Sequence, residues 1–73
     1  MTIESQNWNI LKYMVMGHKI TDETARELFG CSRISARIWD LRHMGIPVLD
    51  DWEYKYDPDG KVAKKWKAYW IAN

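Results

Sequence analysis

The side chains best suited to nucleic-acid chemistry gather in one short stretch: Ser32, Arg33, Ser35, Ala36 and Arg37. An arginine can bind a phosphate, or a guanine through a pair of hydrogen bonds, and a serine can contact the phosphate backbone. An alanine allows close approach or touches a thymine methyl group. These residue types indicate double-stranded DNA as the ligand if they share the outward face of one helix. The alternative is that both arginines are solvated, with Arg37 paired to Asp40.

Three apolar residues at helical spacing predict a helix from about residue 33 to 44: Ile34, Ile38 and Leu41. Their stripe would face the core and turn the arginines and serines outward. Ser32 is the expected N-terminal cap. Gly45 ends the helix, and Pro47 prevents it from resuming.

Residues 21–30 predict another helix, immediately before the helix at residues 33–44 in the chain. Thr21 can cap its N-terminus by accepting a bond from an unpaired amide of the first turn. Gly30 can take the left-handed conformation that ends it. Its buried face is expected from three residues: Ala25, Leu28 and Phe29. Two helices joined by a short turn with glycine form a helix-turn-helix, whose second helix commonly enters the major groove of DNA.

A further helix is expected at the start of the chain, capped by Ser5 and running to about Met16. Its apolar stripe is expected from Trp8, Leu11 and Val15, so Trp8 is predicted to lie in the core. Two more residues widen that stripe: Ile10 and Met14. The short segment 18–20 is expected to form an extended turn that packs Ile20 onto the following helix.

After residue 45 the pattern changes from helix to strand. Residues 46–56 and 61–71 alternate apolar and charged side chains, and residues 57–60 have the composition of a turn. A β-hairpin after a helix-turn-helix is a wing. The predicted fold is therefore mainly α with a β-hairpin: a winged helix-turn-helix of three helices and a two-stranded wing, in one domain spanning residues 1–73. Val48, with Tyr69 or Ile71, is expected to close the core.

The predicted wing carries two further groups of candidate residues. Lysines that can grip flanking phosphates are Lys61, Lys64 and Lys65. Aromatic side chains that can contact a partner protein are Trp52, Tyr54 and Trp66. The alternative interpretation of the lysines is a solvated edge strand, paired across the hairpin with aspartates and glutamates.

Charge is segregated along the chain, although the formal net charge is only +1. Residues 50–60 carry five acidic groups and one lysine, whereas residues 61–73 carry four lysines and no acid. Such segregation can form a local basic patch, or the two strands can neutralise each other.

Other functional classes find little support in the composition. Cys31 is the single cysteine, so no intramolecular disulfide or cysteine-based zinc site is expected, and we expect it to be a small buried hydrophobe. No catalytic set, phosphate-binding loop or metal cluster is present, so we expect no enzyme activity, no cofactor and no metal. Without a signal-peptide pattern or an apolar run long enough for a bilayer, a cytoplasmic protein is expected, with no membrane partner.

The run TDETARELFGCSRISARIWDLRHMGIPV resembles a small helix-turn-helix family of bacteriophages and prophages. The similarity extends from Gln6 to Ile71. Positions that match by type and spacing are Ser32, Arg33, Arg37, Ile38, Leu41 and Gly45. The resemblance implies a winged helix-turn-helix that binds DNA. The acidic stretch between Leu49 and Gly60 departs from the family pattern and argues against a simple contact between wing and phosphate.

Two hypotheses follow. The first is a sequence-specific DNA-binding protein, encoded by a phage or prophage and regulating transcription, with helix 33–44 in the major groove and hairpin 46–71 as its wing. It would act as a homodimer or bind cooperatively, because one such module covers little DNA. The second is a protein-binding module or inhibitor that uses the aromatic wing against a host protein.

Overall fold

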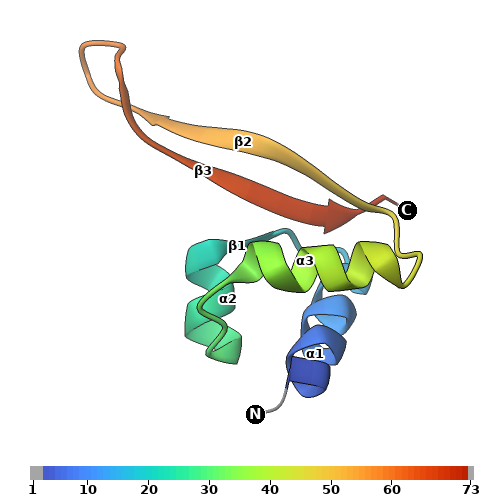
Figure 1. Cartoon of the computed structure of the whole chain (residues 1–73). Coiled ribbons are helices and arrows are strands. Elements are labelled where there is room, and N and C mark those ends of the chain that lie inside the picture. Colours follow the sequence, from blue (N-terminus) through green and yellow to red (C-terminus); the bar gives the residue numbers. More distant parts are fainter. Residues whose placement is uncertain (1–2, 73) are drawn as a thin grey trace.

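The computed structural model describes residues 3–72, and a long β-hairpin lies across three packed helices (Figure 1). The elements, in chain order, are α1 (Ile3–Val15), β1 (Ile20–Thr21), α2 (Asp22–Phe29), α3 (Ile34–His43), β2 (Val48–Tyr56) and β3 (Val62–Ile71). The hairpin reaches well beyond the helices at its turn (Figure 1). Three helices followed by a hairpin confirm the predicted succession of elements.

The sheet has three antiparallel strands in the order β1-β3-β2, so the prediction of a two-stranded wing was wrong. Ile20 pairs with Tyr69 and Thr21 pairs with Ala68. The expected turn at residues 18–20 instead ends in a strand, because its backbone pairs with the edge of β3 that β2 leaves open. Two residues are too few to produce an alternating pattern that the sequence could reveal.

Helix α2 begins and ends as predicted. The Thr24 amide donates a hydrogen bond to Thr21 Oγ1 at 3.2 Å. Gly30 has a φ of 62°, and its amide donates to the Arg26 carbonyl. The expected buried face was partly wrong: Ala25 is buried and Phe29 is partly buried, but Leu28 is mostly exposed. In a helix of only two turns, one narrow stripe reaches the core.

The apolar stripe of α3 is confirmed, since Ile34, Ile38 and Leu41 are all buried. The predicted cap was wrong. Arg33 occupies the N-cap position without a side-chain cap bond, and Ser32 lies one residue before it. Cys31 is buried in the core as expected, and this anchors the turn so that the helix begins one residue later than a Ser32 cap requires.

Helix α1 is rotated relative to the expectation, and it begins at Ile3 rather than after a cap at Ser5. Ile10 and Met14 are fully buried, whereas Trp8 is 61% exposed and Val15 is also mostly exposed. The prediction of Trp8 in the core was therefore wrong. Two apolar stripes compete on this helix, and the stripe with Ile10 and Met14 packs against the rest of the core.

The base of the hairpin closes the core as predicted, through Val48 and Tyr69, with Ile71 partly buried beside them. Cross-strand pairs share a face of the sheet, and the face alternates with each residue along a strand. The inner face is the one that continues from Val48 and Tyr69 and carries Asp50, Trp52, Tyr54, Lys65 and Lys67. The outer face carries Asp51, Glu53, Lys55, Lys64 and Trp66. Among the described residues, no helix is both long and apolar enough to cross a bilayer.

Candidate nucleic-acid interface

The outward surface at the start of α3 is formed by the residues that the sequence singled out. With Ile34 and Ile38 buried, the side chains of Ser32, Arg33 and Ser35 are exposed and Ala36 is partly exposed. Arg33 occupies the N-cap position of α3 and forms no ion pair with another described residue. The four residues from Ser32 to Ala36 that were predicted to contact DNA thus share one accessible end of α3.

A stacked pair of rings continues this outward face toward the end of α3. Trp39 is 59% exposed, and its ring centroid lies 3.6 Å from that of His43. His43 Nδ1 lies 3.0 Å from the Trp39 carbonyl oxygen. Because a carbonyl only accepts, Nδ1 carries the proton, and Nε2 is the nitrogen left for other contacts. The sequence reasoning missed this pair, although its i, i+4 spacing is a recognisable signal.

Arg37 does not share this accessible face. Its side chain is only 15% exposed, and Nε lies 3.2 Å from Asp40 Oδ2. The Asn7 amide of α1 donates to the same Asp40 oxygen at 3.3 Å. The pairing with Asp40 that the sequence offered as an alternative is present, and Asp40, which lies between Arg37 and Asn7, joins α3 to α1.

Arg42 connects α3 to the wing. Its guanidinium donates to the Val48 carbonyl and to Asp50 Oδ2, and Lys67 Nζ lies 3.8 Å from Asp50 Oδ1. The hydrogen bond from Arg42, followed by the nearby charge of Lys67, lowers the pKa of Asp50 below its ordinary value of 3.8. This carboxylate therefore stays ionised between two cations. Sequence reasoning missed the contact, because no local pattern links α3 to β2.

The inner face of the wing combines lysines with aromatic rings. Lys65 Nζ lies 5.1 Å from the centroid of the Trp52 ring, and Lys67 Nζ lies 5.5 Å from it. Each of the two ammonium groups therefore forms a cation–π contact with the same indole ring. Tyr54, two residues farther along β2, is about half exposed. A basic and aromatic surface therefore extends from Arg42 along the inner face.

Comparison with known families agrees with the observed fold. A family model described as a winged helix-turn-helix domain matches residues 5–73. The chain belongs to the winged helix-turn-helix domain family. No curated protein and no solved structure matched it.

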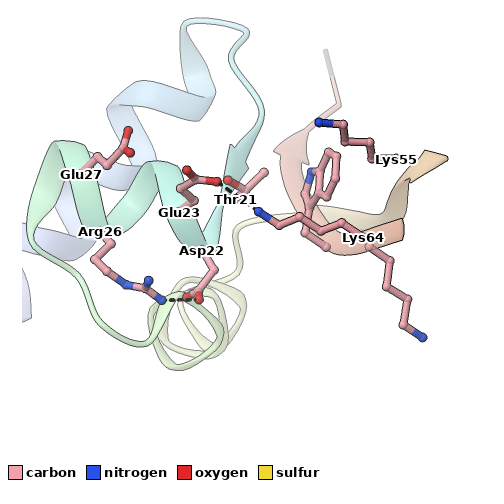
Figure 2. A pocket seen from close by; sticks show the side chains of 9 residues that line it. Thr21, Asp22, Glu23, Arg26, Glu27, Lys55 and Lys64 are labelled. Atoms are coloured by element: carbon pink, nitrogen blue, oxygen red, sulfur yellow. Dashed lines mark hydrogen bonds and ion pairs between the residues drawn. The ribbon is translucent and has the colours of Figure 1, made fainter. Parts of the chain in front are cut away.

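The outer face of this winged helix-turn-helix domain has a different character. A groove of about 700 Å³ lies between α2 and the wing. Figure 2 shows Lys64 reaching across it toward Glu23, with Nζ 3.8 Å from the carboxylate, while Asp22 pairs with Arg26 at 2.7 Å. Acidic residues of α2 therefore attract Lys64. Lys64 and Lys65 are consecutive in β3 and therefore start on opposite faces of the wing, although both side chains line this groove.

The remaining wing candidates are also separated by face. Trp66 lies on the outer face, partly buried, and its Nε1 donates to Glu53 Oε1 at 2.9 Å. Lys61 lies at the exposed turn. Lys65 thus shares the inner face with Trp52 and also borders the groove beside α2, whereas Lys64 extends toward Glu23 and Lys61 lies at the turn. Within the described residues, no cluster of side chains could hold a metal ion.

Proposed function

We propose that this winged helix-turn-helix domain binds double-stranded DNA with the outward face of α3 and the inner face of the wing. The observation that carries the proposal is the continuity of these two surfaces. Arg42 of α3 joins them through Asp50 of the wing, and Lys65 and Lys67 lie on the same face of the wing as Asp50. Not all acidic residues of β2 lie on the face proposed to contact DNA, because Asp51 and Glu53 belong to the outer face.

Each residue of the proposed interface is assigned a separate contact with DNA. Arg33, Ser35 and Ala36 enter the major groove, and Ser32 contacts the backbone beside it. Lys65 and Lys67 bind flanking phosphates, a contribution that depends on salt and not on base sequence. Arg37 supports the interface indirectly, by pairing with the Asp40 carboxylate that accepts a hydrogen bond from Asn7 of α1. As a biological role, we propose a sequence-specific transcription regulator encoded by a phage or prophage and acting in the bacterial cytoplasm.

A salt-dependent titration tests DNA binding. Tryptophan fluorescence would report binding of the full chain to a mixed-sequence duplex at several salt concentrations. We expect affinity to fall linearly on a log–log plot, with a slope that gives the number of phosphate contacts. Arg33→Ala should weaken binding, whereas Arg26→Ala, which removes an exposed arginine paired on α2, should not. Absence of binding even at low salt would contradict the proposal.

A second candidate function is capture of a host protein by the aromatic wing. The observation in its favour is that Tyr54 and the 60% exposed Tyr56 lie side by side, with ring centroids 6.2 Å apart. Exposed aromatic clusters are typical of protein interfaces. Under this alternative, substituting Trp52 or Tyr54 would abolish activity in the host while DNA binding stayed unchanged, and Arg33→Ala would have no effect.

A further inference from the structure

Helix α1 has apolar side chains on two sides, and the domain buries one of them. Ile10 and Met14 lie in the core, while Trp8, Val15 and the 73% exposed Met16 face outward, with Leu11 partly buried between the two sides. Trp8, Leu11 and Val15 are spaced at i, i+3 and i+7, the spacing of a helix stripe that packs against another helix. A helix that is apolar on both sides is normally covered on both sides.

Two shallow apolar hollows lie along this stripe. One, of about 300 Å³, is bounded by α1 and the end of α3 and includes Leu41 and Met44. The other, of about 250 Å³, runs along α1 and includes Val15 and Met16. Trp8 and Leu11 line both hollows and therefore form the ridge between them. A ridge with a hollow on each side is the surface that helix packing requires.

We propose that a second copy of this chain covers the stripe, with the two α1 helices packed antiparallel about a two-fold axis. In such an interface the same surface serves both partners, so each surface must offer both a projection and a matching recess. The Trp8 ridge beside the Met44 hollow offers both. Among the side chains that the structure describes, Lys12 is the single charged residue lining the two hollows, so the described part of the surface is apolar rather than complementary to a charged partner.

The size of the surface indicates a weak dimer. Trp8, Val15, Met16 and Met44 together expose apolar surface on the order of 500 Å², below the ~800 Å² per partner of a standard stable interface. We therefore expect self-association that is modest in solution and stronger when two copies occupy adjacent DNA sites. The residues proposed to contact DNA do not line the stripe. Dimerisation itself does not depend on the proposed function; only its enhancement by DNA does.

Sedimentation equilibrium of the full chain over a wide concentration range tests this directly. We expect a monomer–dimer equilibrium with a Kd of roughly ten micromolar to one millimolar. Trp8→Ser should weaken it at least about tenfold, since a large aromatic at the centre of an interface is often its strongest contact. Tyr56→Ser is the matched control, because Tyr56 is as exposed as Trp8 but lies at the far end of the wing. Met16→Lys is a second disrupting variant.

Methyl spectra locate the contact. With rising concentration, the Met16 and Met44 methyl signals should shift, while that of the buried Met14 stays as a reference. A chain that remains monomeric at all concentrations would overturn the proposal, as would equal weakening by Trp8→Ser and Tyr56→Ser. These experiments contain no DNA, so their results are independent of the DNA titration. A chain that dimerises but does not bind DNA would contradict the proposed function and leave the proposed dimer intact.

Discussion

Arg42 of α3 and Asp50 of β2 are joined by a hydrogen-bonded ion pair of 2.8 Å, and the same guanidinium donates to the Val48 carbonyl at 2.9 Å. A guanidinium is rigid and planar, so two acceptors on one strand restrict its orientation. One of the two contacts by which Arg42 joins α3 to the wing therefore depends on the ionisation of a single carboxylate.

The Arg42–Asp50 pair predicts a specific acid sensitivity. Because the pKa of Asp50 is lowered in the folded state, its stabilising effect is complete above the ordinary value of 3.8 and is lost as pH falls through the lower folded value. Asp50→Asn should reduce stability at neutral pH and flatten the decline in acid. Urea unfolding at a series of pH values measures both effects. Asp51→Asn, on the outer face, is the control, and an identical pH profile for the two variants would contradict the prediction.

Opposite faces of the wing predict opposite outcomes for two consecutive lysines. Lys65→Ala should weaken DNA binding and reduce the salt-dependence slope by about one. Lys64→Ala should leave the slope unchanged, because Lys64 lies on the outer face toward Glu23. Titrations of both variants over the same salt series provide the comparison. Equal losses would show that DNA does not distinguish the faces.

Substitution of Asp40 is expected to reduce the stability of the fold rather than to remove a contact with DNA. Its Oδ2 accepts from Asn7 and lies beside Arg37, so Asp40→Ala leaves two largely covered polar groups without their shared partner. We expect destabilisation of ~1–3 kcal/mol in urea unfolding. In a double-mutant cycle with Asn7→Ala, the two losses should not add. Additive losses would mean that the contact contributes nothing.

Substitutions of Thr21 are expected to change stability through the N-terminal cap of α2. Thr21→Ala removes the oxygen that accepts from the Thr24 amide and should cost about 1 kcal/mol. Thr21→Ser retains the oxygen and should recover most of that loss. Thermal unfolding of the wild type and the two variants ranks their stabilities. Equal stability of the serine and alanine variants would contradict a capping role.

The sequence predicted those parts of the fold that depend on neighbouring residues. The Thr21 cap, the Gly30 terminator and the Ile34, Ile38 and Leu41 stripe are local signals, and each is confirmed. The orientation of α1 was not predictable in the same way. Two stripes on this helix were almost equally apolar, and the choice between them depends on contacts with distant elements.

In the candidate site, too, features set by neighbouring residues could be predicted, and features set by distant elements could not. The exposed cluster from Ser32 to Ala36 could be inferred, because the buried stripe of α3 determines which residues face outward. The role of Arg42 could not be inferred, since it arises from a carboxylate on another element. Alternation along a strand places Lys64 and Lys65 on opposite faces, but it could not indicate which face of the hairpin lies toward α3.

The central position of β3 has a consequence for how the chain folds. β3 follows every other described element in the chain, yet it lies between β1 and β2 and contributes Tyr69 to the core. During synthesis, the three helices therefore emerge before the strand that connects both sides of the sheet. Contacts such as Ile20 with Tyr69 join residues far apart in sequence, and closing such loops slows folding. The domain should acquire its stability in one late, cooperative step, rather than helix by helix.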